Sequence, residues 1–153
     1  MKSKLVFECL WILFTLLLCA LVLLPIFNNL GERYPFYTEN IVFVIASVTF
    51  MRYIFLLKFH WIANTTYPKV ALIFLSIPIM MYLVDNVYDF QAYVDEEGLY
   101  SLLEKFPVEK QKSLGSYMKT QMIFFWTAAV ISAILLPIRM IVSLWRQRNR
   151  GTV

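Results

Sequence analysis

The chain has 153 residues, of which 60% are hydrophobic and 16% are charged, and its formal net charge is +4. An ordinary soluble domain is about half apolar and about a quarter charged, so this composition argues against one. The apolar residues also gather in long segments, and we predict an all-α integral membrane protein, a bundle of four transmembrane helices in a single membrane domain.

The first predicted transmembrane helix covers residues 5–27 and carries one charge, Glu8. It exceeds the apolar region of a signal peptide and no small-residue cleavage site follows it, so we interpret it as a membrane span. Cys9 and Cys19 lie ten residues apart in it. Helical rise separates them by about 15 Å, beyond the reach of a disulfide, so we interpret both as packing residues.

The second and third predicted spans, residues 40–57 and 69–90, are joined by a short loop that contains the only histidine, His60. Because His60 precedes Trp61, we interpret it as a residue of the membrane interface. A span needs roughly 20 residues. The uncharged run 70–84 is shorter than this, so the third helix must continue through Asp85 towards Asp89.

Residues 91–118 form the only sizeable segment that we predict outside the membrane, on the extracytoplasmic side. Within it we expect a short helix that Asp95 caps and Pro107 ends. Four apolar residues of this helix fall at the spacing of one helical face, which would lie on the membrane surface, on the bundle or on a partner. They are Leu99, Leu102, Leu103 and Phe106.

The fourth predicted span covers residues 119–143 and is followed by a basic cytoplasmic tail, residues 144–153. Ala129 and Ala133 lie four residues apart in this span, a spacing that lets helices approach closely. They favour packing within this bundle or contact with another subunit. Together with the apolar face of the 91–118 segment, they form our candidate partner surface.

Basic and acidic residues divide between the two sides of the predicted bundle. Both termini, the 58–69 loop and the helix ends beside them hold one acid, Glu8, and nine basic residues: Lys2, Lys4, Arg52, Lys58, Lys69, Arg139, Arg146, Arg148 and Arg150. The opposite side holds five basic and nine acidic residues. Lysine and arginine concentrate on cytoplasmic flanks, so we predict both termini in the cytoplasm of a bacterium, with the bundle in its inner membrane.

Three ionisable residues lie inside the predicted spans near the cytoplasmic surface: Glu8, Arg52 and Arg139. Such residues are costly in a membrane and need partners. We hypothesise that Glu8 pairs with Arg52 and that Arg139 approaches the same carboxylate. The alternative is that both arginines extend to lipid phosphates.

A second polar group is predicted at the opposite surface and consists of Glu39, Asp85, Asp89 and Lys119. Asp85 and Asp89 share a helix face because they are four residues apart. We interpret them as the solvated end of a helix, as a site for protons or cations, or as a contact for a partner protein. Asp85, which lies further inside, is the residue to test first.

No catalytic, metal, haem or phosphate-loop motif is recognisable in the sequence, and we predict no cofactor and no nucleic-acid partner. We expect a non-enzymatic accessory or scaffold subunit of a membrane complex, whose partners are the lipid bilayer and other membrane subunits or further copies of itself. A small oligomeric transporter or channel that uses the outer carboxylates is the main alternative, and an integral membrane enzyme is the third.

Overall fold

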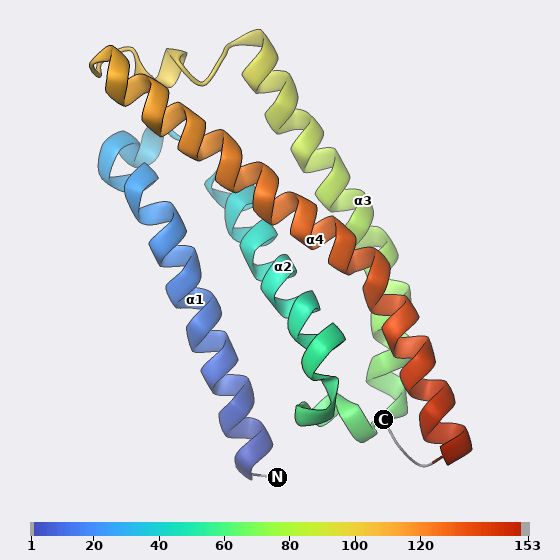
Figure 1. The fold of residues 1–153 in the computed structure, drawn as a ribbon. Helices are drawn as coiled ribbons and strands as arrows, with labels where there is room; N and C mark the ends of the chain where they lie inside the picture. Colours follow the sequence, from blue (N-terminus) through green and yellow to red (C-terminus); the bar gives the residue numbers. More distant parts are fainter. Residues whose placement is uncertain (1, 151–153) are drawn as a thin grey trace.

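The longest element of the structure, helix α4 (Val108–Arg150), packs against two of the other long helices (Figure 1). The computed structural model describes the backbone of residues 2–150 and the side chains of residues 5–149. Buried apolar residues recur along α4 every three, four or seven positions and so form one stripe. They are Leu114, Met118, Met122, Ala129, Ala133, Leu136 and Met140. The stripe belongs to the common core with α2 (Tyr37–Leu56) and α3 (Thr66–Glu96), which makes α4 the centre of the bundle.

Helix α1 (Lys2–Leu30) lies at the edge of the bundle and contacts mainly α2 (Figure 1). Its buried apolar residues, Cys19, Val22, Ile26 and Leu30, cover one narrow face of its second half. The Tyr117 hydroxyl of α4 donates a hydrogen bond of 2.8 Å to the Val22 carbonyl and ties the two helices together. Most other leucine, isoleucine and phenylalanine side chains of α1 are exposed. This surface is suited to lipid rather than water.

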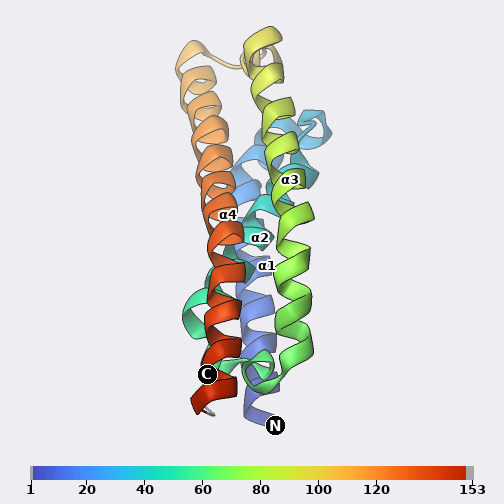
Figure 2. The ribbon, with the colours of Figure 1, turned by 90° about the vertical axis from the view of Figure 1, so that its right-hand side faces the viewer.

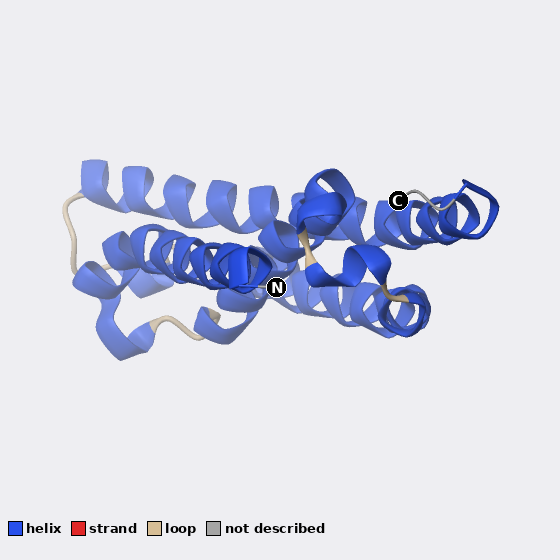
Figure 3. Ribbon diagram, turned by 90° about the horizontal axis from the view of Figure 1, so that it is seen from below, coloured by secondary structure: helices blue, strands red, loops and turns tan. Residues whose placement is uncertain are grey.

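All regular elements among residues 2–150 are helical (Figure 3), and four of these helices are long and apolar enough to cross a membrane. Short 3₁₀ helices connect them: η1 (Gly31–Arg33), η2 (Leu57–Phe59), η3 (Trp61–Asn64) and η4 (Ser101–Leu103). Helix α1 begins and α4 ends at the same end of the bundle (Figure 1). We call this the basic end, and it also holds η2 and η3. The opposite end, with η1 and η4, is the acidic end.

The acidic end differs from the prediction, because the two longest helices take up most of the 91–118 segment. Helix α3 continues to Glu96, so Asp95 lies in its last turn and does not cap a new helix. Gly98, at φ +74°, ends α3 in the left-handed conformation, and its N–H donates to the Tyr93 carbonyl. Glycine adopts this backbone without steric cost. Pro107 immediately precedes α4 rather than ending a helix, and its carbonyl accepts the Gln111 N–H of α4 at 2.9 Å. Figure 2 shows that α3 and α4 both reach this end, where the connection between them closes the bundle.

The proposed partner surface is largely inside the molecule. Leu99 and Leu103 are buried, Leu102 and Phe106 pack against the same core, and Ala129 and Ala133 belong to the α4 stripe. The connection between α3 and α4 therefore folds down onto α4. Its apolar side chains cover the chain's own core, and these six residues do not form an exposed contact surface.

Candidate functional site

The basic end contains a buried polar network that joins α1 to α2. The Glu8 carboxylate lies 3.2 Å from Arg52 Nη1 through Oε2 and 2.6 Å from His60 Nδ1 through Oε1. Arg52 Nη2 donates to the Tyr53 hydroxyl at 3.2 Å. The structure therefore brings together Glu8 and Arg52, as hypothesised, and adds two neighbours.

His60 is not the interfacial residue that its position beside Trp61 indicated. Its side chain is fully buried, whereas Trp61 is half exposed. The backbone of His60 is extended between η2 and η3, and this turns the ring inward to Glu8. The rings of Phe7 and Tyr53 meet the imidazole edge to face, with centroids 5.1 and 4.9 Å away. Local sequence does not signal this contact, because Glu8 and His60 are 52 residues apart.

The chemistry of the network is that of a structural contact. An ionised carboxylate only accepts hydrogen bonds. Glu8 accepts from Arg52 on one oxygen, so in the short contact on its other oxygen the donor is His60 Nδ1. Arg52 is 9% exposed, and removing its counter-ion would leave a buried charge. Because Glu8 is on α1 and its two partners are on or just after α2, the network holds the start of the peripheral helix against the bundle.

Arg139 does not join the Glu8 carboxylate, which corrects the second half of that hypothesis. Its Nε donates to the Ile54 carbonyl at 3.0 Å. Ile54 lies in the last turn of α2, where carbonyls have no partner within the helix. An arginine satisfies such a carbonyl and also interacts favourably with the negative end of the helix dipole. Arg139 is therefore a cap for α2, supplied by α4.

Lys69 is a further polar residue of the basic end that the sequence interpretation left as a loop flank. It is fully buried, and its Nζ donates to the Ala63 carbonyl at 2.6 Å and to Gln147 Oε1 at 2.8 Å. Gln147 in turn donates to the Asn64 carbonyl at 3.0 Å. The end of α4 is thus fixed to η3. A lysine at the start of a span is ordinary in sequence, so no local signal separates this residue from an interfacial one.

The predicted outer cluster is not assembled as one site. Asp85 and Asp89 are both exposed on α3, and both ion pairs found among residues 5–149 involve Glu8 instead. Lys119 is also exposed and lines a small pocket of about 180 Å³ with Gln91 and Asp95. The four predicted residues lie on three different helices. Helical spacing could place only Asp85 and Asp89 on one face, and it could not predict how the three helices are arranged.

Glu39 belongs to a separate group of polar atoms at the start of α2. Its Oε2 is buried without a hydrogen-bond partner, and Asn40 next to it is fully buried. The Tyr34 hydroxyl is also buried. Burial raises the pKa of the Tyr34 phenol above its usual range, so this hydroxyl stays protonated. The group is local in sequence, since all three residues lie between positions 34 and 40.

The described residues contain no cluster of three or more histidine, cysteine, aspartate or glutamate side chains that is close enough to hold a metal ion. Two of the grooves on the bundle surface, one along α1 and α2 and one between α2 and α3, are lined mainly by apolar residues, and the charged side chains lie towards the two ends of the bundle. Comparison of the chain with protein-family models, with curated proteins and with solved structures finds no match.

Proposed function

We propose that the protein is a small integral membrane protein that acts as an accessory subunit by binding a transmembrane helix of a partner. The observation that carries the proposal is an apolar groove of about 430 Å³ between α2 and α3, which both pack on α4 and leave this space between them. The groove residues are Val42, Ile45, Ala46, Thr49, Phe50, Leu75, Pro78, Ile79 and Tyr82.

The shape and lining of the groove suit a helix. Ala46 and Thr49 are small and lie three residues apart on α2, so an incoming backbone can approach closely there. The lining exposes almost no polar atoms, as expected for a surface that faces hydrocarbon. The four apolar helices and the basic N-terminal and C-terminal flanks support insertion in a membrane with both termini on the cytoplasmic side.

The carboxylate of Asp85 indicates which kind of side chain a partner helix would carry. Tyr82 lines the groove, and Asp85 lies one turn further along the same side of α3. Asp85 is exposed on this side, within a helix long and apolar enough to cross a membrane. A carboxylate in that position is stabilised by a donor on another helix. We therefore infer that the partner helix carries a lysine, an arginine or another hydrogen-bond donor at the depth of Asp85.

The test is site-specific photo-crosslinking in the cells of origin. A photoreactive residue replaces Ile45, which lines the groove, and a control places it at Leu13, which is exposed on α1. We expect a discrete protein product at Ile45 and only lipid adducts at Leu13. Asp85→Asn should reduce the Ile45 product severalfold, whereas Asp89→Asn, the same change one turn nearer the surface, should leave it unchanged. Equal products at both positions, or equal effects of both aspartate variants, would contradict the proposal.

The transporter or channel alternative is favoured by the same exposed carboxylate, because a second copy of the chain could cover it. The crosslinking experiment separates the two functions by mass. A product of twice the 18.1 kDa chain mass would indicate self-association and support the alternative. A product with a different protein would support the accessory role.

A further inference from the structure

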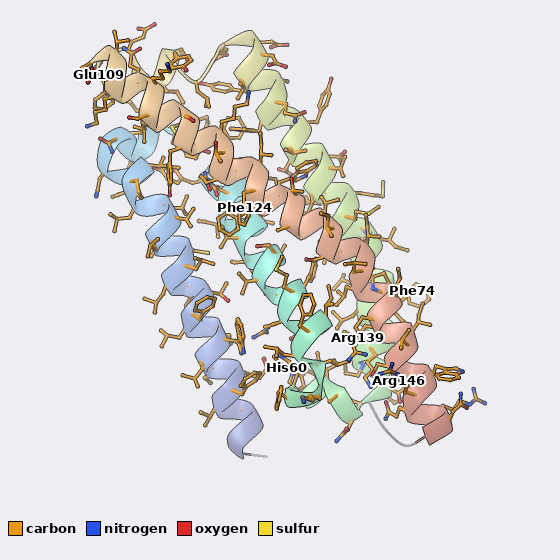
Figure 4. The ribbon with its side chains drawn as sticks, viewed as in Figure 1. His60, Phe74, Glu109, Phe124, Arg139 and Arg146 are labelled. Carbon is orange, nitrogen blue, oxygen red and sulfur yellow. The ribbon has the colours of Figure 1, made fainter. Side chains whose placement is uncertain are left out.

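Three positive charges without a carboxylate gather at the basic end, between the end of α4 and the start of α3. Lys69 Nζ donates to Gln147, which follows Arg146 on α4, and Arg139 lies two turns before Arg146 on the same helix. In Figure 4, Arg139 and Arg146 lie next to each other on the last part of α4. Both ion pairs among residues 5–149 use Glu8, with Arg52 and His60, and so no described carboxylate lies within 4.0 Å of the three cations. We call Lys69, Arg139 and Arg146 the cationic triad.

The triad is built into the fold rather than scattered on its surface. Lys69 is fully buried and held by Ala63 and Gln147, so its charge cannot move away into solvent. The Nε of Arg139 is held by the Ile54 carbonyl, and that bond does not use the N–H groups of its two Nη atoms. Arg146 is exposed and lies two helical turns after Arg139, about 10 Å along α4. The repulsion among these three like charges is relieved by an anion.

From this arrangement we propose that the cationic triad binds the phosphate group of an anionic phospholipid. Arg139 and Arg146 contact the phosphate, and buried Lys69 adds its charge from behind. Arginine is suited to this role because its planar fork donates two parallel hydrogen bonds to phosphate oxygens. Basic pockets between helices at the cytoplasmic surface are recognised sites for anionic headgroups.

The surroundings favour a lipid over a free phosphate ion. Ile138 and Ile141 flank Arg139 on α4, and both are 55% exposed, so acyl chains can cover them. Trp145 precedes Arg146 and is also exposed. Exposed tryptophan is characteristic of the headgroup level of a membrane, which is where a lipid phosphate lies. The inference rests on the membrane insertion that we propose above, but not on the partner helix.

Native mass spectrometry of the full chain in mild detergent tests the site. Phosphatidylglycerol should bind more tightly than zwitterionic phosphatidylcholine, and millimolar inorganic phosphate should not displace it. Arg146→Gln should weaken phosphatidylglycerol binding about fivefold, the effect of one basic residue near an anionic surface. Arg148→Gln is the matched control, because it removes the same charge two residues later, on another face of α4. Its affinity should stay close to that of the unmodified chain.

Several results would overturn the inference. Equal affinity for the two lipids would exclude recognition of the anionic headgroup, and equal effects of Arg146→Gln and Arg148→Gln would reduce the site to a diffuse basic tail. Displacement by inorganic phosphate would keep the phosphate chemistry but exclude the lipid. Both arginines are exposed, so neither substitution threatens the fold. Because the measurement needs no partner protein, its failure is distinguishable from failure of the proposed accessory function.

Discussion

At the scale of single residues, Glu8 is the centre of a network of buried polar contacts. Two buried groups, Arg52 and His60, depend on one carboxylate that is itself only 15% exposed. Breaking a buried ion pair by removing one partner is more costly than never having formed it, because the remaining charge stays desolvated. The network therefore matters for stability because loss of the Glu8 carboxylate would leave the Arg52 charge buried without a partner.

We expect Glu8→Gln to lower the free energy of unfolding by about 2–3 kcal/mol, because Arg52 would remain buried without a counter-ion. Circular dichroism of thermal unfolding in detergent measures the change. Glu104→Gln is the control, since Glu104 is exposed at the opposite end, and it should change stability by less than about 0.5 kcal/mol. If the two variants unfold at the same temperature, the Glu8 network does not hold the bundle together.

At the scale of elements, the helix ends depend on residues from elsewhere in the chain or on glycine. Arg139 of α4 caps α2, Gln147 of α4 fixes η3, and Gly98 turns the chain at the end of α3. Each device satisfies or redirects backbone groups that a helix end leaves without partners. The positions where helices end are therefore set by tertiary contacts as much as by local propensity.

Two glycines provide a matched test at this scale. Gly98→Ala should destabilise the protein by about 1–2 kcal/mol, because alanine at φ +74° places Cβ against its own backbone. Gly115→Ala should be neutral or stabilise it by up to about 1 kcal/mol, because Gly115 is inside α4, where alanine has the higher helix propensity. An added Cβ there meets Leu103 Cδ1 at 3.5 Å, an ordinary van der Waals distance. Thermal unfolding of both variants, followed by circular dichroism, measures the two changes in stability. A clear loss of stability in both variants, or in neither, would contradict the different roles that we give to the two glycines.

At the scale of the whole molecule, α1 begins and α4 ends at one end of the bundle, which constrains topology (Figure 1). A chain that crosses a membrane four times must place these two ends on one side. The excess of lysine and arginine at this end supports our proposal that this side is the cytoplasm.

Cysteine labelling tests this topology in a variant that lacks Cys9 and Cys19. A cysteine at Ser101, exposed at the acidic end, should react with a membrane-impermeant maleimide in intact cells. A cysteine at Asn149, exposed at the basic end, should react only after permeabilisation. The reverse pattern would show that the termini lie outside the cytoplasm and would leave the four-helix bundle unaffected. Equal labelling at both positions would contradict four crossings of the membrane in one orientation.

The sequence by itself determined the helical class and the number and order of the four long helices. These properties follow from local composition, because an apolar run of sufficient length and few charges specifies a span without reference to the rest of the chain. Charge counting likewise predicted which polar residues share an end. It placed Glu8 and Arg52 at one depth, and the structure joins them.

Only the tertiary structure decided which polar groups meet and which apolar faces are covered. His60 and Lys69 are buried by contacts with residues far away in the sequence, and Arg139 bonds a carbonyl of α2 rather than an acid. Periodicity shows that a helix has an apolar face, but it does not show which part of the protein or which partner covers that face. The sequence therefore allowed a partner to cover Leu99 and Leu103, whereas in the structure both residues belong to the core that α4 helps to form. Likewise, only the structure shows that Tyr82, one turn before the exposed Asp85, lines a groove between α2 and α3.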